Sequence, residues 1–255
     1  MTITFERRGT GKPLLLIHGL GSTRAAWAPV LPLLPGRELI LLDLPGHGSS
    51  PPEQDSGTFE GLARSLEHWL ATEKLTGVAM VGSSLGARLV LELARRGLTG
   101  PVVALDPGGF WQGWERTLVG SSLSASVLLL RAIKPALPVL SRNVLSRSAL
   151  LAQLSARPWA LDGDFVAHEL ASLAETATVD SLIHNLAQGS VQVGPAASGP
   201  ITIGWGRHDR LCLPVQASRA QQAYPGSRLV WFDHSGHFPM WDEPEKAAAL
   251  ILKTT

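Results

Sequence analysis

The chain has 255 residues, of which 45% are hydrophobic and 17% charged, and its formal net charge is +1. This composition supports a large apolar core in one α/β domain with an insertion, or in two compact domains. Lysine and arginine are scattered, so we expect no nucleic-acid partner, and the single cysteine excludes an internal disulfide.

Short apolar runs alternate with segments of helical spacing along the chain. The runs predicted as buried strands are 13–17, 39–42, 78–81, 102–105, 201–205 and 229–232. The predicted helices are 27–34, 60–75, 85–96, 215–223 and 243–251. This alternation predicts an α/β fold with a mostly parallel sheet and helices on both faces.

The stretch 111–190 breaks the alternation, because it has helical spacing throughout. Three prolines are its expected breaks: Pro135, Pro138 and Pro158. We predict a helical cap (lid) at 111–195 over a core formed by 1–110 and 196–255, with 194–200 as the linker that returns to the core.

Within this predicted cap, 118–140 is the most apolar long stretch of the chain. It contains Arg131, Lys134 and two prolines, whereas a membrane span needs about 20 residues that are almost free of charge. We therefore expect cap helices and no membrane span. Residues 1–8 have no apolar run typical of a secretory signal, so the default prediction is a cytoplasmic protein.

The most informative motif is Gly82-Ser83-Ser84-Leu85-Gly86, which lies between a predicted strand and a predicted helix. A serine at such a tight turn has its hydroxyl group held clear of the sheet, and the flanking glycines avoid collisions with neighbouring backbone. To act as a nucleophile, Ser84 needs a base within hydrogen-bond reach and a carboxylate that orients this base.

Candidates for both partners follow Ser84 in the chain. Asp209 comes just after the predicted strand 201–205, and His237 lies in a loop beyond the last predicted strand. Both positions belong to the carboxyl edge of a parallel sheet, where the sites of α/β proteins form. Asp106, after strand 102–105, remains an alternative acid, and His234 an alternative base.

Two backbone amides are candidates for binding a developing oxyanion. The turn His18-Gly19-Leu20-Gly21 follows the first predicted strand, and a glycine-flanked turn can aim the N–H group of Leu20 at the reacting oxygen. The second donor would be the N–H group of Leu85, the residue after the serine.

Together with Asp43-Leu44-Pro45-Gly46-His47-Gly48-Ser49, these motifs resemble the α/β-hydrolase superfamily in its serine-nucleophile branch, over nearly the whole chain except about 111–195. The resemblance implies that Ser84 is the nucleophile, Asp209 the acid and His237 the base, with Leu20 and Leu85 supplying the oxyanion-hole amides. The serine argues against haloalkane dehalogenases and epoxide hydrolases, which carry aspartate at this turn.

The resulting hypothesis is a carboxylesterase-like enzyme that hydrolyses a small acyl substrate through an acyl-enzyme. No metal or organic cofactor is expected, because the chain has no metal-binding motif and no Cys/His cluster. Thioesterase, lactonase and carbon–carbon bond hydrolase activities remain alternatives, as does a non-catalytic receptor for a small molecule. The sequence does not indicate the oligomeric state.

The substrate pocket is predicted from large side chains in and near the cap. Four aromatic residues are its expected walls: Trp111, Trp114, Trp159 and Phe238. A carbon–carbon hydrolase would also need polar side chains for its acidic substrate. Four residues of the cap could serve: Arg131, Arg142, Asn143 and Arg147.

Overall fold

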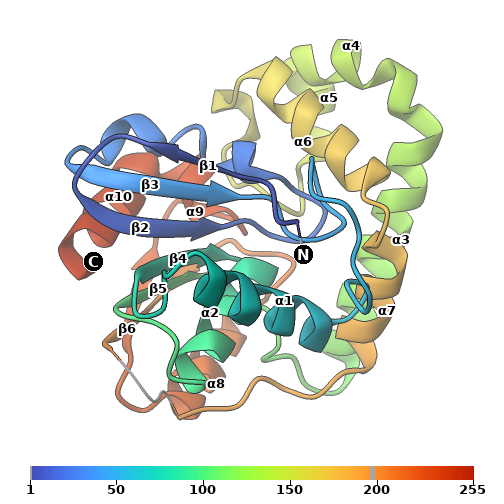
Figure 1. The fold of residues 1–255 in the computed structure, drawn as a ribbon. Helices are drawn as coiled ribbons and strands as arrows, with labels where there is room; N and C mark the ends of the chain where they lie inside the picture. The colour runs from blue at the N-terminus through green and yellow to red at the C-terminus, as the bar shows by residue number, and fades with distance from the viewer. Residues whose placement is uncertain (1, 196–198) are drawn as a thin grey trace.

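The computed structural model describes residues 2–195 and 199–255, and within them seven strands form one sheet in the order β1-β3-β2-β4-β5-β6-β7 (Figure 1). The strands are β1 (Phe5–Arg8), β2 (Lys12–Ile17), β3 (Arg37–Leu42), β4 (Ala79–Ser83), β5 (Val102–Leu105), β6 (Ile201–Gly206) and β7 (Arg228–Phe232). All neighbouring pairs are parallel except β1 and β3. The predicted mostly parallel α/β sheet is therefore confirmed.

Helices cover both faces of the sheet, which explains why its central strands are apolar without alternation. In β2, Leu15 and Ile17 pack with α1 (Phe59–Thr72), α2 (Leu85–Arg95) and α8 (Val215–Ala223). Leu14 and Leu16 face the opposite side, where they join a cluster with α10 (Pro244–Thr254). Successive side chains of a strand point to opposite faces, so an unbroken apolar run serves both layers.

Two elements differ from the sequence-based expectation. Strand β1 was not predicted, because Phe5–Arg8 carries three charged residues; its register with β3 makes it an edge strand. The predicted helix 27–34 is instead two 3₁₀ turns, η1 (Arg24–Trp27) and η2 (Leu31–Leu33). Pro29 and Pro32 lack the N–H groups that an α-helix needs there. A further short helix, α9 (Pro239–Asp242), precedes α10.

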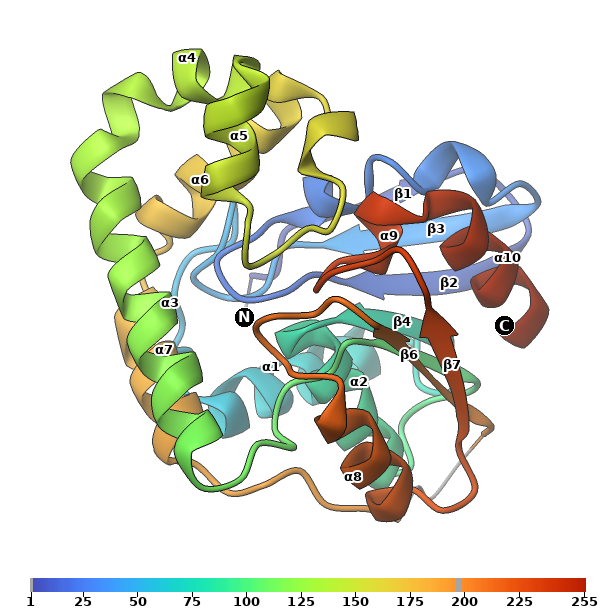
Figure 2. The ribbon, with the colours of Figure 1, turned by 180° about the vertical axis from the view of Figure 1, so that it is seen from behind.

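A helical segment separates β5 from β6. It consists of α3 (Trp114–Ile133), η3 (Lys134–Ala136), α4 (Leu137–Arg142), α5 (Val144–Leu150), η4 (Pro158–Ala160), α6 (Gly163–Glu175) and α7 (Val179–Gln188). Figures 1 and 2 show these helices beside the ends toward which the arrows of β2 and β3 point. The three predicted proline breaks lie in η3, at the start of α4 and at the start of η4. The predicted core boundary at 196, with residues 196–198 of the linker, lies outside the described residues.

The stretch Trp114–Arg142 is long and apolar enough, by length and composition alone, to cross a membrane, and 22% of its apolar part is buried. The structure divides this stretch into α3, η3 and α4, and α3 packs against α6 and α7. That it forms cap helices and no membrane span stays a prediction.

Candidate active site

Ser84 lies at the sharp turn between β4 and α2, and its backbone has a φ of 55°. A positive φ is uncommon for a residue with a side chain and is found where the surrounding structure enforces it. The turn is closely packed at its two flanking glycines. A Cβ atom on Gly82 would lie 2.2 Å from the carbonyl oxygen of Gly86, and one on Gly86 would lie 2.2 Å from that of Ile17. The predicted need for glycine at both positions thus has a steric cause.

A chain of hydrogen bonds joins Ser84 to His237 and Asp209. The Ser84 Oγ atom lies 2.8 Å from Nε2 of His237, and Nδ1 of His237 lies 2.8 Å from Oδ2 of Asp209. The other Asp209 oxygen accepts hydrogen bonds from the backbone N–H groups of Leu211 and Cys212, at 2.8 and 2.9 Å. Because an ionised carboxylate only accepts, we assign the proton of the ring to Nδ1, which leaves Nε2 to accept from the serine hydroxyl.

The alternative acid Asp106 and the alternative base His234 lie differently from Asp209 and His237. Asp106 is buried and accepts from the Gly206 N–H group at 2.8 Å. Burial and then the charge of Asp209 raise the pKa of Asp106 well above its usual value. His234 and Asp233 are both exposed, and Asp233 forms ion pairs with basic side chains. The structure therefore brings Asp209 and His237, rather than these rivals, to Ser84.

The loop after β2 passes directly beside Ser84. A Cβ atom on Gly19 would lie 3.1 Å from that of Ser84, and Leu20, Ser84 and Leu85 line the same cavity. Leu85 is the first residue of α2, so its N–H group has no acceptor within the helix. Both amides lie near the serine, and their role in binding an oxyanion stays a prediction.

His18 holds this loop against the neighbouring one after β3. Its Nε2 atom accepts from the Leu44 N–H group at 3.0 Å, so Nδ1 carries the proton and donates to the Gly19 carbonyl oxygen at 2.7 Å. Burial lowers the pKa of His18 to about 4, and a neutral ring is what this donor–acceptor pair requires. His18 thus has a structural place in the loop.

The cavity at Ser84 is small and mostly apolar, with a volume of about 60 Å³. Ligand pockets commonly measure about 300–1,000 Å³, so the cavity admits only a small group unless the helices above it move. Its apolar walls come from the core and from the helical segment: Leu20, Trp111, Val119, Leu123, Leu154, Leu173, Leu186, Leu211 and Phe238.

The predicted aromatic walls are only half correct. Trp111 and Phe238 are buried and line the cavity. Trp114 and Trp159 do not line it; they are 67% and 57% exposed. Trp114 begins α3 and Trp159 lies in the short helix η4, so neither forms the cavity wall that was predicted for it.

The polar residues suggested for the cap also lie elsewhere. Arg131 and Arg142 form exposed ion pairs with Asp180 and Asp164. Arg147 is buried but donates to backbone carbonyl groups such as that of Pro158, and Asn143 caps α5 with its side chain. A charged residue that the sequence analysis did not single out, Arg88 of α2, lines the cavity instead.

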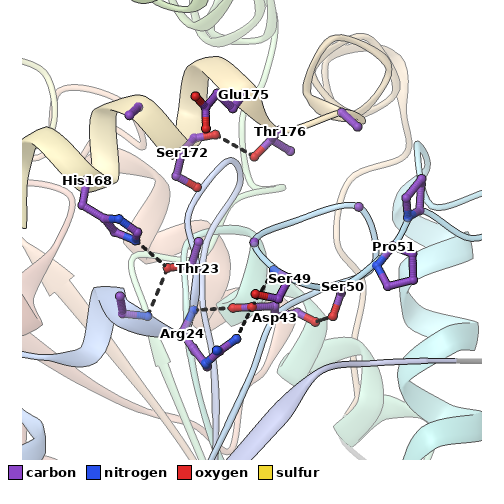
Figure 3. Close-up of a pocket in the computed structure, with 16 residues that line it drawn as sticks. Thr23, Arg24, Asp43, Ser49, Ser50, Pro51, His168, Ser172, Glu175 and Thr176 are labelled. Atoms are coloured by element: carbon purple, nitrogen blue, oxygen red, sulfur yellow. Dashed lines mark hydrogen bonds and ion pairs between the residues drawn. The ribbon is translucent and has the colours of Figure 1, made fainter. Parts of the chain in front are cut away.

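A larger hollow of about 700 Å³ lies between the loops after β2 and β3 and helix α6 (Figure 3). Polar residues such as Arg24, Asp43, His168 and Glu175 line it, and Arg24 forms an ion pair with Asp43 inside it. None of its lining residues belongs to the Ser84–His237–Asp209 chain. Despite its larger volume, it is therefore not the candidate active site.

Within the described residues, one group of side chains lies close enough together to hold a metal ion. Its possible ligand atoms, from Asp209, Cys212 and His237, lie within 4.8 Å of one another. The Nδ1 atom of His237 is already hydrogen-bonded to Asp209. Burial raises the pKa of the Cys212 thiol well above its usual value, which disfavours the thiolate that binds metals. These side chains are therefore better suited to the hydrogen-bond chain of Ser84 than to binding a metal ion. That the protein binds no metal stays a prediction.

The fold is that of an α/β-hydrolase, and residues 14–250 match the model of the Alpha/beta hydrolase family. The chain belongs to this family. It is 28% identical to an uncharacterized protein of Mycobacterium tuberculosis, over 97% of this chain and 76% of that protein. It is 25% identical to lipase 1 of Psychrobacter immobilis, over 93% of this chain and 75% of the lipase.

Solved structures support the same fold. A thermophilic esterase from Thermogutta terrifontis is 20% identical and superposes with a TM-score of 0.77, covering 98% of this chain and 92% of the esterase. The family and the similarity to the lipase together support a hydrolase activity.

Proposed function

We propose that the protein is a serine hydrolase that cleaves a carboxylic ester, or a closely related acyl substrate, through an acyl-enzyme on Ser84. The observation that carries the proposal is the pair of 2.8 Å contacts linking Ser84 to His237 and His237 to Asp209. Ser84 and His237 line a small apolar cavity, which suits the acyl part of such a substrate.

In the proposed reaction, His237 takes the proton of Ser84 as the Ser84 Oγ atom attacks the ester carbonyl carbon. Asp209 holds the ring in the required tautomer and stabilises the imidazolium that forms. The amides of Leu20 and Leu85 bind the oxyanion, each such donor contributing about 3 kcal/mol to the transition state. The alcohol leaves with the proton from His237, and a water molecule activated by His237 then releases the acid.

The helical segment from α3 to α7 would act as the cap predicted from the sequence. Five of its residues line the cavity at Ser84: Val119, Leu123, Leu154, Leu173 and Leu186. Because the cavity has only about 60 Å³, movement of these helices would control which substrates enter.

The first experiment is burst release of p-nitrophenol from a short-chain and a medium-chain p-nitrophenyl ester. We expect a burst with the wild type and a loss of at least about 10³-fold in Ser84→Ala. Ser83→Ala is the matched control, since Ser83 is the adjacent buried serine and its Oγ atom has no hydrogen-bond partner in the described residues. A folded wild type with neither burst nor steady turnover would refute the esterase proposal.

A further inference from the structure

Arg88 is a buried cation in the wall of the cavity that contains Ser84. It lies one turn after Ser84 on α2, and its backbone N–H group donates to the Ser84 carbonyl oxygen at 3.0 Å. The residue is only 4% exposed. Among the residues described as lining the cavity, it is the only lysine or arginine.

The guanidinium group of Arg88 is incompletely satisfied. Its Nη2 atom donates to the Ser190 carbonyl oxygen at 2.7 Å, and Nε donates to the Gln192 side chain at 3.3 Å. The Nη1 atom is buried and has no hydrogen-bond partner in the part of the chain that the structure describes. The rings of Phe59 and Trp111 lie 4.1 and 5.9 Å from the centre of the guanidinium, and these contacts leave the Nη1 donors unused.

No carboxylate of the described residues forms an ion pair with Arg88. Glu92, one turn further along α2, directs its oxygens to Arg95 and Arg96 instead. Burial lowers the pKa of Arg88 only to about 10, so the side chain is charged at neutral pH. A buried cation with an unused donor is costly to a folded protein, and the carboxylate of a ligand would satisfy the Nη1 atom.

We propose that Arg88 binds a carboxylate on the substrate, so that the preferred substrates are half-esters of short dicarboxylic acids. This inference rests on the proposed ester hydrolysis at Ser84 and names the class of acyl group. A carboxylate matches the planar guanidinium in shape and carries one negative charge, which a single arginine can balance. A phosphate group carries more charge than this one cation neutralises.

The size of the cavity limits the length of the acyl group. Ser84 and Arg88 line the same cavity of about 60 Å³, so only a short chain of methylene groups can join the carbonyl at Ser84 to a carboxylate at Arg88. Methanol or another small alcohol is the leaving group. The balanced reaction is half-ester plus water giving the dicarboxylic acid and the alcohol, with no further reactant.

The test compares monomethyl with dimethyl esters of glutaric and adipic acid at neutral pH. For the wild type we expect kcat/KM to be at least about tenfold higher for the monomethyl ester, which carries the carboxylate. In Arg88→Gln this ratio should fall to one or below, whereas Arg88→Lys should retain part of it. Arg131→Gln is the matched control, since Arg131 forms an exposed ion pair on α3, and it should keep the wild-type ratio.

Each outcome separates the inference from the function on which it rests. If the wild type hydrolyses the dimethyl and the monomethyl esters with equal kcat/KM, the carboxylate subsite is refuted while ester hydrolysis stands. If neither set is hydrolysed and p-nitrophenyl esters also give no burst, the proposed function fails. Should Arg88→Gln not fold, as judged by circular dichroism, the wild-type ratio and the Arg88→Lys ratio still decide the question.

Discussion

Replacing Glu169 by glutamine should make the protein more stable at high pH and leave it unchanged at low pH. Glu169 lies on α6 and is 5% exposed. It accepts a hydrogen bond of 2.5 Å from the Ser22 hydroxyl group, and its Oε1 atom has no hydrogen-bond partner in the described residues. The contact joins α6 to the loop that contains Leu20.

The magnitude follows from the pKa of this carboxyl group. Burial raises the pKa of Glu169 from 4.5 to about 7. Between these two values the folded protein holds a proton that the unfolded chain releases, so the stabilisation present below pH 4.5 is lost as the pH rises to about 7. At about 1.36 kcal/mol per pKa unit, ionisation of Glu169 lowers the free energy of unfolding by about 3 kcal/mol in total.

Glutamine has nearly the shape of a protonated glutamate and does not ionise. Glu169→Gln should therefore match the wild type near pH 4.5 and exceed its free energy of unfolding by about 3 kcal/mol at pH 8. The assay is urea unfolding of both proteins from pH 5 to 8, with the free energy taken by linear extrapolation.

Two buried histidines act in the opposite direction and must be separated from this effect. Burial lowers the pKa of His18 to about 4 and that of His47 to about 3, so stability decreases as the pH falls below 6.5. Both proteins share these residues, and their contribution cancels in the difference. Glu175→Gln, at an exposed position of the same helix, should show no comparable pH-dependent difference. A difference for Glu169→Gln that is flat with pH, or that grows toward low pH, would refute the reasoning.

Two further predictions concern the turn at the serine and the surface of the helical segment. Gly86→Ala should prevent normal folding, because the new Cβ atom would lie 2.2 Å from the Ile17 carbonyl oxygen; soluble yield and urea unfolding check this, and wild-type stability would contradict it. Trp159→Ser should change the free energy of unfolding by less than about 0.5 kcal/mol and leave p-nitrophenyl ester hydrolysis as it is, because this side chain is 57% exposed and does not line the cavity. A large loss of hydrolysis would contradict this prediction and would indicate that Trp159 contacts the substrate.

Local patterns were sufficient for the central sheet and for the turn at Ser84. A strand buried on both faces must be apolar along its length, so β2 and β5 stand out in the sequence. The turn at Ser84 depends on close contacts between neighbouring backbone groups, and these contacts need glycine at particular positions. The order of the motifs along the chain then indicated which aspartate and which histidine lie at the same edge of the sheet.

Packing between distant elements decided the rest. The charged run Phe5–Arg8 becomes a strand only because β3 offers it an edge. Arg88 and Glu169 look like ordinary solvated residues of amphipathic helices, and only the elements packed against them make them buried and incompletely paired. Whether a tryptophan of the helical segment faces the cavity or the solvent depends on how these helices lie against the core. The sequence by itself determined the α/β class and the three candidate catalytic residues, because local sterics and sheet topology control both. The shape and charge of the cavity were decided by tertiary structure, because they arise from side chains far apart in the chain.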